Sequence, residues 1–552
     1  MQLHRRVLGS AAGLGRTCNT LRAAPTRTYL QFKHNMSVTV ATAVAVAEEA
    51  ATPSFVAPVA VTSVDETQYG PQLQAKIRKL KDLFAEFNPP ELEVFESPPS
   101  HYRMRAEFTI EQRDGNFRYV MFDNSPAPPP PPQPGTAAED AADGGGAAAA
   151  AAASTSAPAA AASEAAAAAA PPARGGGGGG GGRPKGPRRV TVESFPVASR
   201  QLNELMEVVR RECAECPELR TRLFQANFHT TLAGDAMVTL LYHRKLGPEW
   251  AAAAERLRDA LAATPTAAAA GRRPHVIGRS RKQKLELEAG FVLESLTVGG
   301  RQYVQKQVEG AFSQPNGTVC QHMLGWAMDV TRAQPQGPEE GQQPAQEAQE
   351  GQQPQKRPRL TAAGEAGDGA PEAEAEAEAA NGGGGEAAEG GGPQDDLLEL
   401  YCGNGNFTVP LAQNFRRVVA TEVSKSSVEA ARFNLEANGV SNVFLARMAS
   451  EEFAETMRAR GSRRRLEGLG PWEELRLRTI LVDPPRAGLD DFTVQLLQEF
   501  DRIVYISCNP ETLHANLRAI AATHRIARFA AFDQFPYTHH LECGVYLTRR
   551  AA

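Results

Sequence analysis

The sequence predicts an α/β fold for the last part of the chain, built around a mainly parallel sheet. From Asp396 onwards, short apolar runs alternate regularly with helical stretches, which is typical of a doubly wound parallel sheet. The last two apolar runs, Ala527–Phe532 and Gly544–Thr548, have no helix between them and predict an antiparallel pair at the edge of the sheet. Upstream, strand-like runs mixed with helices predict a separate α+β domain.

The elements of the C-terminal domain follow one another at short intervals. Helices are expected from about Phe407 and over Ser426–Asn438, each between two strands. The expected parallel strands are Leu397–Tyr401, Arg417–Thr421, Val443–Arg447, Thr479–Val482 and Arg502–Ile506. In the upstream domain, an amphipathic helix is expected over 71–90. Its clearest strands are Ala106–Ile110, Phe117–Phe122 and Met237–Tyr242.

Two stretches of low complexity divide the chain. Residues 125–188 consist largely of Ala, Gly and Pro, and residues 331–394 are rich in Gln, Glu, Ala and Gly. Neither contains enough aromatic and branched apolar residues to form a core, so we expect both to be disordered. The expected organisation is a leader at 1–65, an α+β region at 66–330 that the first insert interrupts, an acidic linker at 331–394 and an α/β domain at 395–552.

The net charge of -5 pools unlike segments. Residues 331–394 contain twelve acidic and four basic residues, a net of -8, so the rest of the chain sums to +3. A globally basic protein is therefore excluded, and any binding of nucleic acid must use local basic patches. The sequence has no run of 18 apolar residues, so no membrane span is expected.

The first 47 residues contain six basic residues and no acidic ones, among many Ser, Thr, Ala and Leu residues. This composition is typical of an organellar transit peptide, and it lacks the compact apolar core of a secretory signal. We expect import into a plastid or mitochondrion, with no preference between them. Translation from Met36 would remove most of this leader and leave the protein in the cytosol or nucleus.

The seven cysteines are scattered and do not form a disulfide framework. Cys213 and Cys216 form a CxxC pair without a second pair, so a metal or redox role is not favoured. Cys508 is more informative, because it directly follows the strand expected at Arg502–Ile506. Ligands of open α/β sheets gather at the carboxyl ends of strands. The alternative is a small buried hydrophobic residue, which is the usual role of a free cysteine.

Two further strand ends carry polar motifs. A glycine-rich turn, with Gly403 and Gly405, follows the first strand, and Glu422 follows the second. This spacing favours a nucleoside cofactor whose ribose hydroxyls bind the carboxylate, although the third glycine of a dinucleotide motif is missing. Asp483-Pro-Pro ends the fourth strand, and its prolines must turn the chain out over the pocket.

Seven motifs together closely resemble the tRNA (uracil-54-C5)-methyltransferase family. They are YRMRAEF (102–108), LLYHRK (240–245), SQPN (313–316), ELYCGNGNF (399–407), DPPRAGL (483–489), YISCNPETL (505–513) and FDQFPYTHHLECGV (532–545). The resemblance covers nearly all the sequence outside the leader and the two inserts. It implies a Rossmann-like domain that uses S-adenosyl-L-methionine (SAM) to form 5-methyluridine in the T-loop of tRNA, and an N-terminal RNA-binding domain.

The resemblance also implies a role for each motif residue. Cys508 is the expected nucleophile that adds to carbon 6 of uracil, and Glu542 is the expected base that removes the proton from carbon 5. Without the resemblance, Glu542 would be interpreted as a surface carboxylate on a strand. The expected cofactor-binding residues are Gln314, Tyr401, Asn406, Glu422 and Asp483. For Asn406 and Gln314, a helix-capping role is the alternative.

The target base must be flipped out of a stacked loop, so aromatic and basic side chains are expected to hold the RNA. The resemblance favours Phe224 and His243 as loop contacts. The other candidates are Arg103, Arg105 and the basic run Arg279–Lys284. Each of these residues has a simpler alternative, because Phe224 is equally consistent with a core residue and the basic run with a solvated surface.

The expected partner is the T-arm of tRNA, with no metal and no membrane, and the protein is expected to be a monomer. Two other functions remain open at this stage. A ribosomal RNA uridine methyltransferase would use related chemistry, although neither the N-terminal barrel nor the iron-sulfur cysteine cluster often found in those enzymes is evident here. A tRNA-binding folding factor would need the RNA-binding residues but not Cys508.

Overall fold

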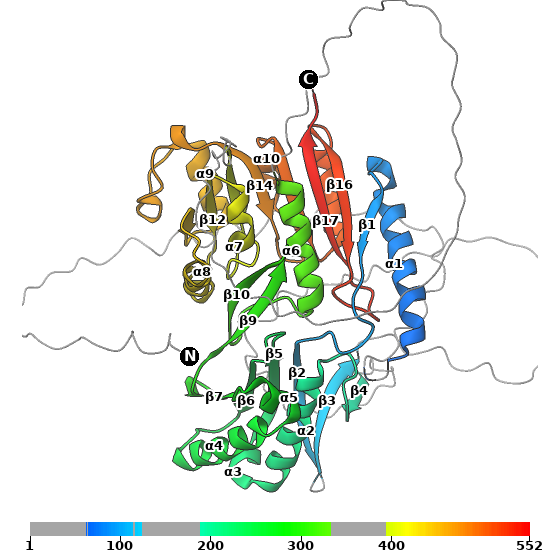
Figure 1. The fold of residues 1–552 in the computed structure, drawn as a ribbon, viewed down its shortest axis with the longest axis vertical. Helices are drawn as coiled ribbons and strands as arrows, with labels where there is room; N and C mark the ends of the chain where they lie inside the picture. Colours follow the sequence, from blue (N-terminus) through cyan, green and yellow to red (C-terminus); the bar gives the residue numbers. More distant parts are fainter. Residues whose placement is uncertain (1–61, 63, 114–115, 124–187, 333–393, 552) are drawn as a thin grey trace, which may run out of the picture. The chain divides into compact units, whose positions relative to one another are not determined.

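The computed structural model describes residues 62, 64–113, 116–123, 188–332 and 394–551 (Figure 1). The predictions for the leader and for most of the two inserts lie outside these residues. Organelle import and disorder of the inserts therefore stay predictions.

The α/β domain contains an eight-stranded sheet in the order β1-β16-β17-β15-β14-β11-β12-β13. Its strands are β1 (Leu92–Phe95), β11 (Asp396–Leu400), β12 (Arg417–Thr421), β13 (Val443–Ala446), β14 (Leu477–Val482), β15 (Arg502–Ser507), β16 (His524–Phe532) and β17 (Glu542–Arg549). The five strands from β13 to β15 are parallel, and β17 is antiparallel to both β15 and β16. The predicted Rossmann-like fold with a C-terminal antiparallel hairpin is confirmed.

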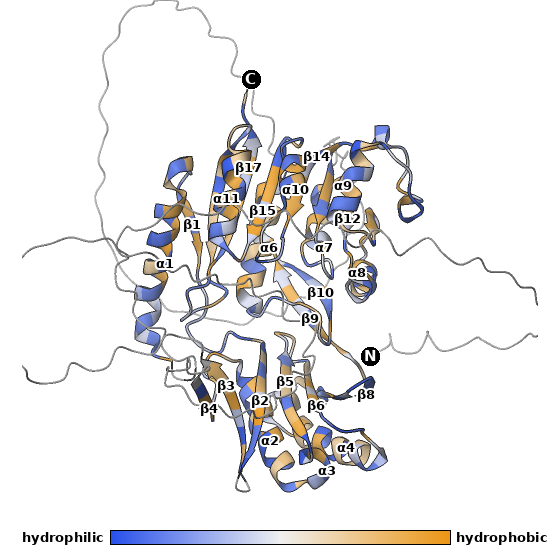
Figure 2. Ribbon diagram, turned by 180° about the vertical axis from the view of Figure 1, so that it is seen from behind, coloured by the Kyte–Doolittle hydropathy of each residue, from blue (hydrophilic) through white to orange (hydrophobic). Residues whose placement is uncertain are grey.

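The strand interiors explain why this sheet forms. Leu398, Ile480 and Val504 are fully buried, and the parallel strands are apolar on both faces because helices cover both sides. Hydrophobic residues are concentrated on β14 and β15 in Figure 2. The helices and 3-10 turns of this part of the chain are α7 (Thr408–Leu411), η3 (Ala412–Asn414), α8 (Lys425–Ala437), α9 (Ser450–Arg458), η4 (Arg464–Leu466), η5 (Trp472–Glu474), α10 (Asp491–Leu497) and α11 (Pro510–Ile520).

A second, seven-stranded sheet forms the α+β region, in the order β4-β3-β2-β5-β6-β7-β8. Its strands are β2 (Arg105–Arg113), β3 (Asn116–Asp123), β4 (Arg188–Val192), β5 (Leu223–Thr230), β6 (Ala236–Tyr242), β7 (His275–Ser280) and β8 (Gln283–Leu287). Its helices are α2 (Arg200–Glu215), α3 (Pro217–Arg220), α4 (Pro248–Ala262) and α5 (Pro265–Ala270). A separate hairpin, β9 (Phe291–Val298) and β10 (Arg301–Val308), precedes α6 (Gly317–Thr331).

Segments near both ends of the predicted α+β region contact the eight-stranded sheet. The strand β1 pairs in parallel with β16 of the eight-stranded sheet, so the β16–β17 pair does not form the edge of that sheet. The helix α6 packs on the same sheet, because a Cβ at Gly544 of β17 would lie 2.9 Å from the Trp326 ring. An unpaired edge strand favours pairing with any available segment, but the sequence pattern alone does not identify that segment.

The helix α1 (Tyr69–Phe84) also contacts the eight-stranded sheet, because Phe84 stacks on Phe529 of β16. It begins slightly before the predicted range 71–90 and ends earlier, because the chain continues in the 3-10 turn η2 (Ala85–Phe87). Another 3-10 turn, η1 (Glu66–Gln68), precedes α1. Lys76 of α1 is buried and lies 2.7 Å from Asp533 Oδ1, and it also donates to the carbonyl of Phe535. Burial lowers the pKa of Lys76 and raises that of Asp533. This buried ion pair ties α1 to the segment between β16 and β17.

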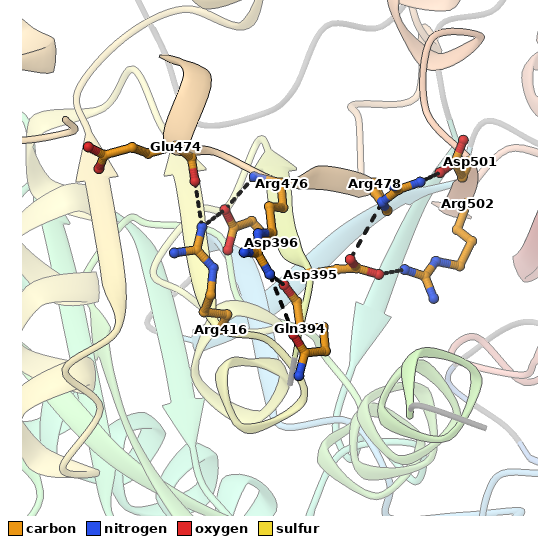
Figure 3. A network of polar contacts seen from close by, with 9 residues as sticks. All are labelled: Gln394, Asp395, Asp396, Arg416, Glu474, Arg476, Arg478, Asp501 and Arg502. Atoms are coloured by element: carbon orange, nitrogen blue, oxygen red, sulfur yellow. Dashed lines mark hydrogen bonds and ion pairs between the residues drawn. The ribbon is translucent and has the colours of Figure 1, made fainter. Parts of the chain in front are cut away.

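A polar network lies at the amino ends of the central strands, opposite the edge where the motifs lie (Figure 3). The carboxylate of Asp396 is fully buried and accepts from Arg416 Nη2 at 2.6 Å and from the backbone N–H of Arg476 at 2.7 Å. Asp395 pairs with Arg502 and Arg478. The network links the starts of β11, β14 and β15 and so fixes how these strands are aligned.

We predict that Lys76→Met lowers the free energy of unfolding by about 3–5 kcal/mol, because Asp533 is left as an uncompensated buried charge. Urea denaturation followed by circular dichroism measures this loss. Lys79→Met is the matched control, since Lys79 forms an exposed pair with Glu511 and its loss costs at most about 1 kcal/mol. Equal losses in the two variants would contradict a structural role for the buried pair.

Candidate active site

Three chain segments meet at the edge of the eight-stranded sheet where its parallel strands end. Asp483 directly follows β14, and Cys508 directly follows β15. Glu542 opens β17, whose antiparallel register pairs Ser507 with Cys543. The thiol and the two carboxyls predicted from the sequence therefore lie at one edge of the sheet.

Cys508 lies in the turn between β15 and α11. Its side chain is partly exposed, unlike Cys402 and Cys543, which are buried. The next residue, Asn509, caps α11 by accepting from the backbone N–H of Glu511 at 3.2 Å. The alternative of a small core residue therefore applies to Cys402 and Cys543 but does not describe Cys508.

The surroundings of Cys508 are mainly negative. Burial, the largest cause, and the carboxyls of Glu542 and Asp483 together raise the pKa of the Cys508 thiol to about 12, and the charge of Arg486 opposes this rise. Glu542 is only 3% exposed, and its Oε2 atom is buried without a hydrogen-bond partner. Burial and the charge of Asp483 raise the pKa of Glu542, and burial also raises the pKa of Asp483.

The glycine-rich turn after β11 is held against the end of β12. Glu422 accepts from the backbone N–H of Gly403 at 3.0 Å and from that of Ser424 at 2.7 Å. Gly403 has a φ of 56°, and a Cβ added there would meet no other atom within 4 Å, so the backbone conformation and not crowding explains the glycine. Tyr401 also has a positive φ, of 60°, which is costly for a residue with a side chain and marks a strained turn at this edge.

Gln314 and Asn406 do not cap helices. The caps of α6 and α7 are Asn316 and Phe407 instead. The Oε1 atom of Gln314 is buried without a hydrogen-bond partner. Asn406 accepts from Gln305 Nε2 of the hairpin strand β10 at 3.0 Å. The capping alternative is therefore wrong for both residues.

Phe224 of β5 and His243, which directly follows the neighbouring strand β6, are brought together in the α+β region. Their rings are stacked, with centroids 3.9 Å apart and planes at 10° to each other. Phe224 is half-buried and His243 is exposed. The pair forms an aromatic surface, and Phe224 is not a core residue.

The segment that contains Arg103 and Arg105 pairs with the segment that contains Gln314. The backbone N–H of Met104 donates to the carbonyl of Pro315 at 2.7 Å, and Arg105 Nη1 donates to the carbonyl of Ala311 at 2.6 Å. Arg103 is half-buried, and burial lowers the pKa of its guanidinium. Two motifs far apart in the sequence are therefore joined by hydrogen bonds.

The basic run Arg279–Lys284 and the CxxC pair, both noted in the sequence, are engaged mainly in contacts within the protein. Arg279 and Lys284 of the basic run both pair with Glu309, so much of their charge is already compensated. In the CxxC pair, Cys213 is buried and Cys216 donates to Glu218. Within the described ranges, no group of three or more His, Cys, Asp or Glu side chains is arranged to hold a metal ion. No helix among the described residues is long and apolar enough to cross a membrane.

Other residues near the motifs were not predicted from the sequence to be site residues. Phe312 is 72% exposed beside the Gln314 segment, and Val423 is 70% exposed directly after Glu422. An exposed large apolar side chain next to a polar motif residue indicates a binding surface, and its exposure is known only from the structure. Glu399 of β11 is almost fully buried, and burial raises its pKa to about 8. Arg486 and His540, both within the motifs, are in contact with each other.

The fold and the site define a methyltransferase-like α/β domain with a thiol and two carboxyls at its ligand-binding edge. A sequence model of the family described as "tRNA (Uracil-5-)-methyltransferase" matches residues 68–128, 183–337 and 387–550. The tRNA/tmRNA (uracil-C(5))-methyltransferase of Chromohalobacter salexigens is 39% identical over 492 residues, which are 89% of this chain and 98% of the relative. The protein of the same name from Aeromonas hydrophila is 40% identical over 485 residues, covering 88% and 95% of the two chains.

A solved tRNA (uracil-54, C5)-methyltransferase from Pyrococcus abyssi, in complex with S-adenosyl-L-homocysteine, is 16% identical, with a TM-score of 0.46 and coverage of 87% and 83%. The family match and the curated relatives are decisive. The chain belongs to the tRNA (uracil-5-)-methyltransferase family.

We predict that Glu542→Gln increases the rate at which iodoacetamide alkylates Cys508 near pH 9. At that pH the raised pKa of Glu542 has been passed, so the carboxyl is ionised and opposes thiolate formation. The rate should rise about tenfold for each unit by which the pKa of the thiol falls. Intact-protein mass spectrometry follows the reaction. Glu499→Gln, which alters an exposed carboxylate in the loop after α10, is the control, and an unchanged rate in Glu542→Gln would contradict the electrostatic coupling.

Proposed function

We propose that this protein uses SAM to methylate carbon 5 of uridine 54 in the T-loop of tRNA, through a covalent adduct between Cys508 and carbon 6. Family membership establishes tRNA uracil-C5 methylation as the class of reaction. The observation that carries the finer proposal is the placement of a partly exposed thiol at the same sheet edge as a buried, unpartnered carboxyl, that of Glu542.

The cofactor-binding side of the proposal rests on the turn after β11. SAM supplies a methyl group on a sulfonium centre. The backbone at Gly403 leaves open space, and Glu422 lies where a ribose can reach its carboxylate. The exposed Val423 offers an apolar surface for the adenine ring, and the buried Oε1 atom of Gln314 needs a hydrogen-bond donor. Tyr401, Asn406 and Asp483 complete the proposed cofactor-binding set.

Cys508 supplies the nucleophile that carbon 5 requires. Its thiol loses a proton to solvent, and the thiolate forms a bond to carbon 6 of uracil. The electron pair of the C5–C6 double bond moves onto carbon 5 and the carbonyl oxygen at carbon 4. Carbon 5 then accepts the methyl group in this activated state.

Glu542 completes the reaction. Its carboxylate removes the proton from carbon 5, the C5–C6 double bond forms again, and the Cys508 thiolate leaves. A base must be ionised but still basic, so a carboxyl whose pKa is raised by burial and by Asp483 suits the task.

The proposed RNA contacts lie on the α+β region. The stacked rings of Phe224 and His243 present a surface on which an unstacked base of the T-loop can pack. Arg103 and Arg105, on the segment that pairs with the Gln314 loop, are the proposed cations near the opened loop. Stacking and charge contacts of this kind offset the few kcal/mol needed to flip the target base.

We predict that Cys508→Ala lowers tRNA methylation at least about 10³-fold while binding of a T-arm RNA stays unchanged, because only the nucleophile is removed. Methyl transfer and filter binding measure the two properties. A tRNA-binding folding factor would instead keep its effect on tRNA folding in this variant.

The target position needs a separate measurement. Cells that lack the protein should lose 5-methyluridine at position 54 of tRNA, as read by mass spectrometry of digested RNA. Loss from ribosomal RNA with tRNA unaffected would contradict the proposal.

A further inference from the structure

The nucleophile proposed above lies in a setting that opposes its ionisation. Glu542 and Asp483 both place negative charge near the Cys508 thiol, and a thiolate beside two carboxylates is disfavoured. A thiol that must attack as a thiolate therefore needs a nearby cation. Arg486 is a cation whose charge acts on both Cys508 and Glu542.

The backbone of Arg486 is fixed against the segment that carries the thiol. Its carbonyl accepts from Asn509 Nδ2 at 3.1 Å, and Asn509 directly follows Cys508. The rest of this loop is braced on α11, because Asn516 accepts from the backbone N–H of Leu489 at 3.1 Å and donates to its carbonyl at 3.2 Å. The loop cannot move away from Cys508 without breaking these bonds.

The guanidinium of Arg486 is fixed against the segment that carries the base. Its Nη2 atom lies 3.0 Å from His540 Nδ1, and His540 is two residues before Glu542. Since a guanidinium only donates, Nδ1 must accept and the imidazole must be neutral. Burial, His539 and Arg486 itself lower the pKa of His540 to about 4, so this acceptor persists at physiological pH.

We propose that Arg486 is a positioning residue, held by His540 and Asn509, whose charge allows Cys508 to react as a thiolate. This inference rests on the proposed function. Arg486 takes no proton. The Cys508 proton passes to solvent, the S–C6 bond forms, and the guanidinium offsets the negative charge of the thiolate before that bond exists.

The charged and titratable groups around this centre come from several elements. The groups whose charges interact with Cys508 or with Arg486 are Asp483 after β14, Tyr505 of β15, Glu542 and Cys543 of β17, and His539 and His540 before β17. Each Arg486 or His540 variant described below therefore changes one group of this centre and leaves the others intact.

The test is the pH profile of Cys508 alkylation by iodoacetamide in the full-length protein, with Cys508→Ala reporting the background. Arg486→Gln should raise the pKa of the thiol and slow alkylation between pH 8 and 9 about tenfold for each unit of the rise. Arg486→Lys keeps the charge and should recover part of the rate. Arg525→Gln, an exposed arginine at the far end of β16 from Glu542, is the matched control and should react like the wild-type protein.

Variants of His540 separate positioning from charge. His540→Asn keeps an acceptor near the position of Nδ1 and should preserve the wild-type profile, whereas His540→Phe should shift it in the same direction as Arg486→Gln. Thermal unfolding of each variant identifies a loss of folding, and only variants with a wild-type transition enter the comparison. Arg486→Lys and His540→Asn, the conservative changes, keep the comparison possible.

Single-turnover methylation of a T-arm RNA separates the two levels of the argument. If Cys508→Ala methylates as fast as wild type, the proposed function fails. If Cys508→Ala is inactive but Arg486→Gln shows the wild-type alkylation profile and the wild-type methylation rate, the role of Arg486 is overturned while the proposed function stands. Slower methylation in Arg486→Gln that recovers as pH rises is the result expected.

Discussion

The antiparallel placement of β17 beside β15 is the constraint on which the site depends. Because Ser507 pairs with Cys543, the residue after β15 and the first residue of β17 come to the same sheet edge. A register shift of one residue would turn Glu542 to the other face of the sheet. The proposed nucleophile and the proposed base are therefore positioned by backbone pairing in the interior of the sheet, where β17 is bonded on both sides.

Bringing a thiol and two carboxyls to one edge has an electrostatic cost. Burial and mutual repulsion raise the pKa of Glu542, which suits a base, but they also raise that of Cys508, which does not suit a nucleophile. The contacts of Arg486 with Asn509 and His540 address this conflict, since they hold a cation between the two chemistry-bearing segments. In the proposed mechanism, one arrangement then serves addition and elimination in turn.

Local patterns and motifs predicted most of the fold and the class of reaction. The apolar periodicity located seven of the eight strands of the eight-stranded sheet to within about three residues at each end, but it did not predict β1. The motifs led to Cys508 and Glu542 as the proposed catalytic residues. The pairing of β1 with β16 was not predictable, because an amphipathic segment does not specify its distant partner. Two contacts likewise depend on tertiary geometry: the stacking of Phe224 on His243 and the contact of Arg486 with His540. The sequence shows that these residues are present but not which of them pair.

The central claim is that Cys508 adds to carbon 6 of the target uracil. The direct measurement is peptide mapping by mass spectrometry after incubation of the protein with SAM and a T-arm RNA that contains 5-fluorouridine at position 54. Fluorine in place of the proton at carbon 5 blocks elimination, so we expect a stable complex in which the RNA is attached to the peptide with Cys508. Active enzyme that forms no such complex, or attachment at another residue, would contradict the account.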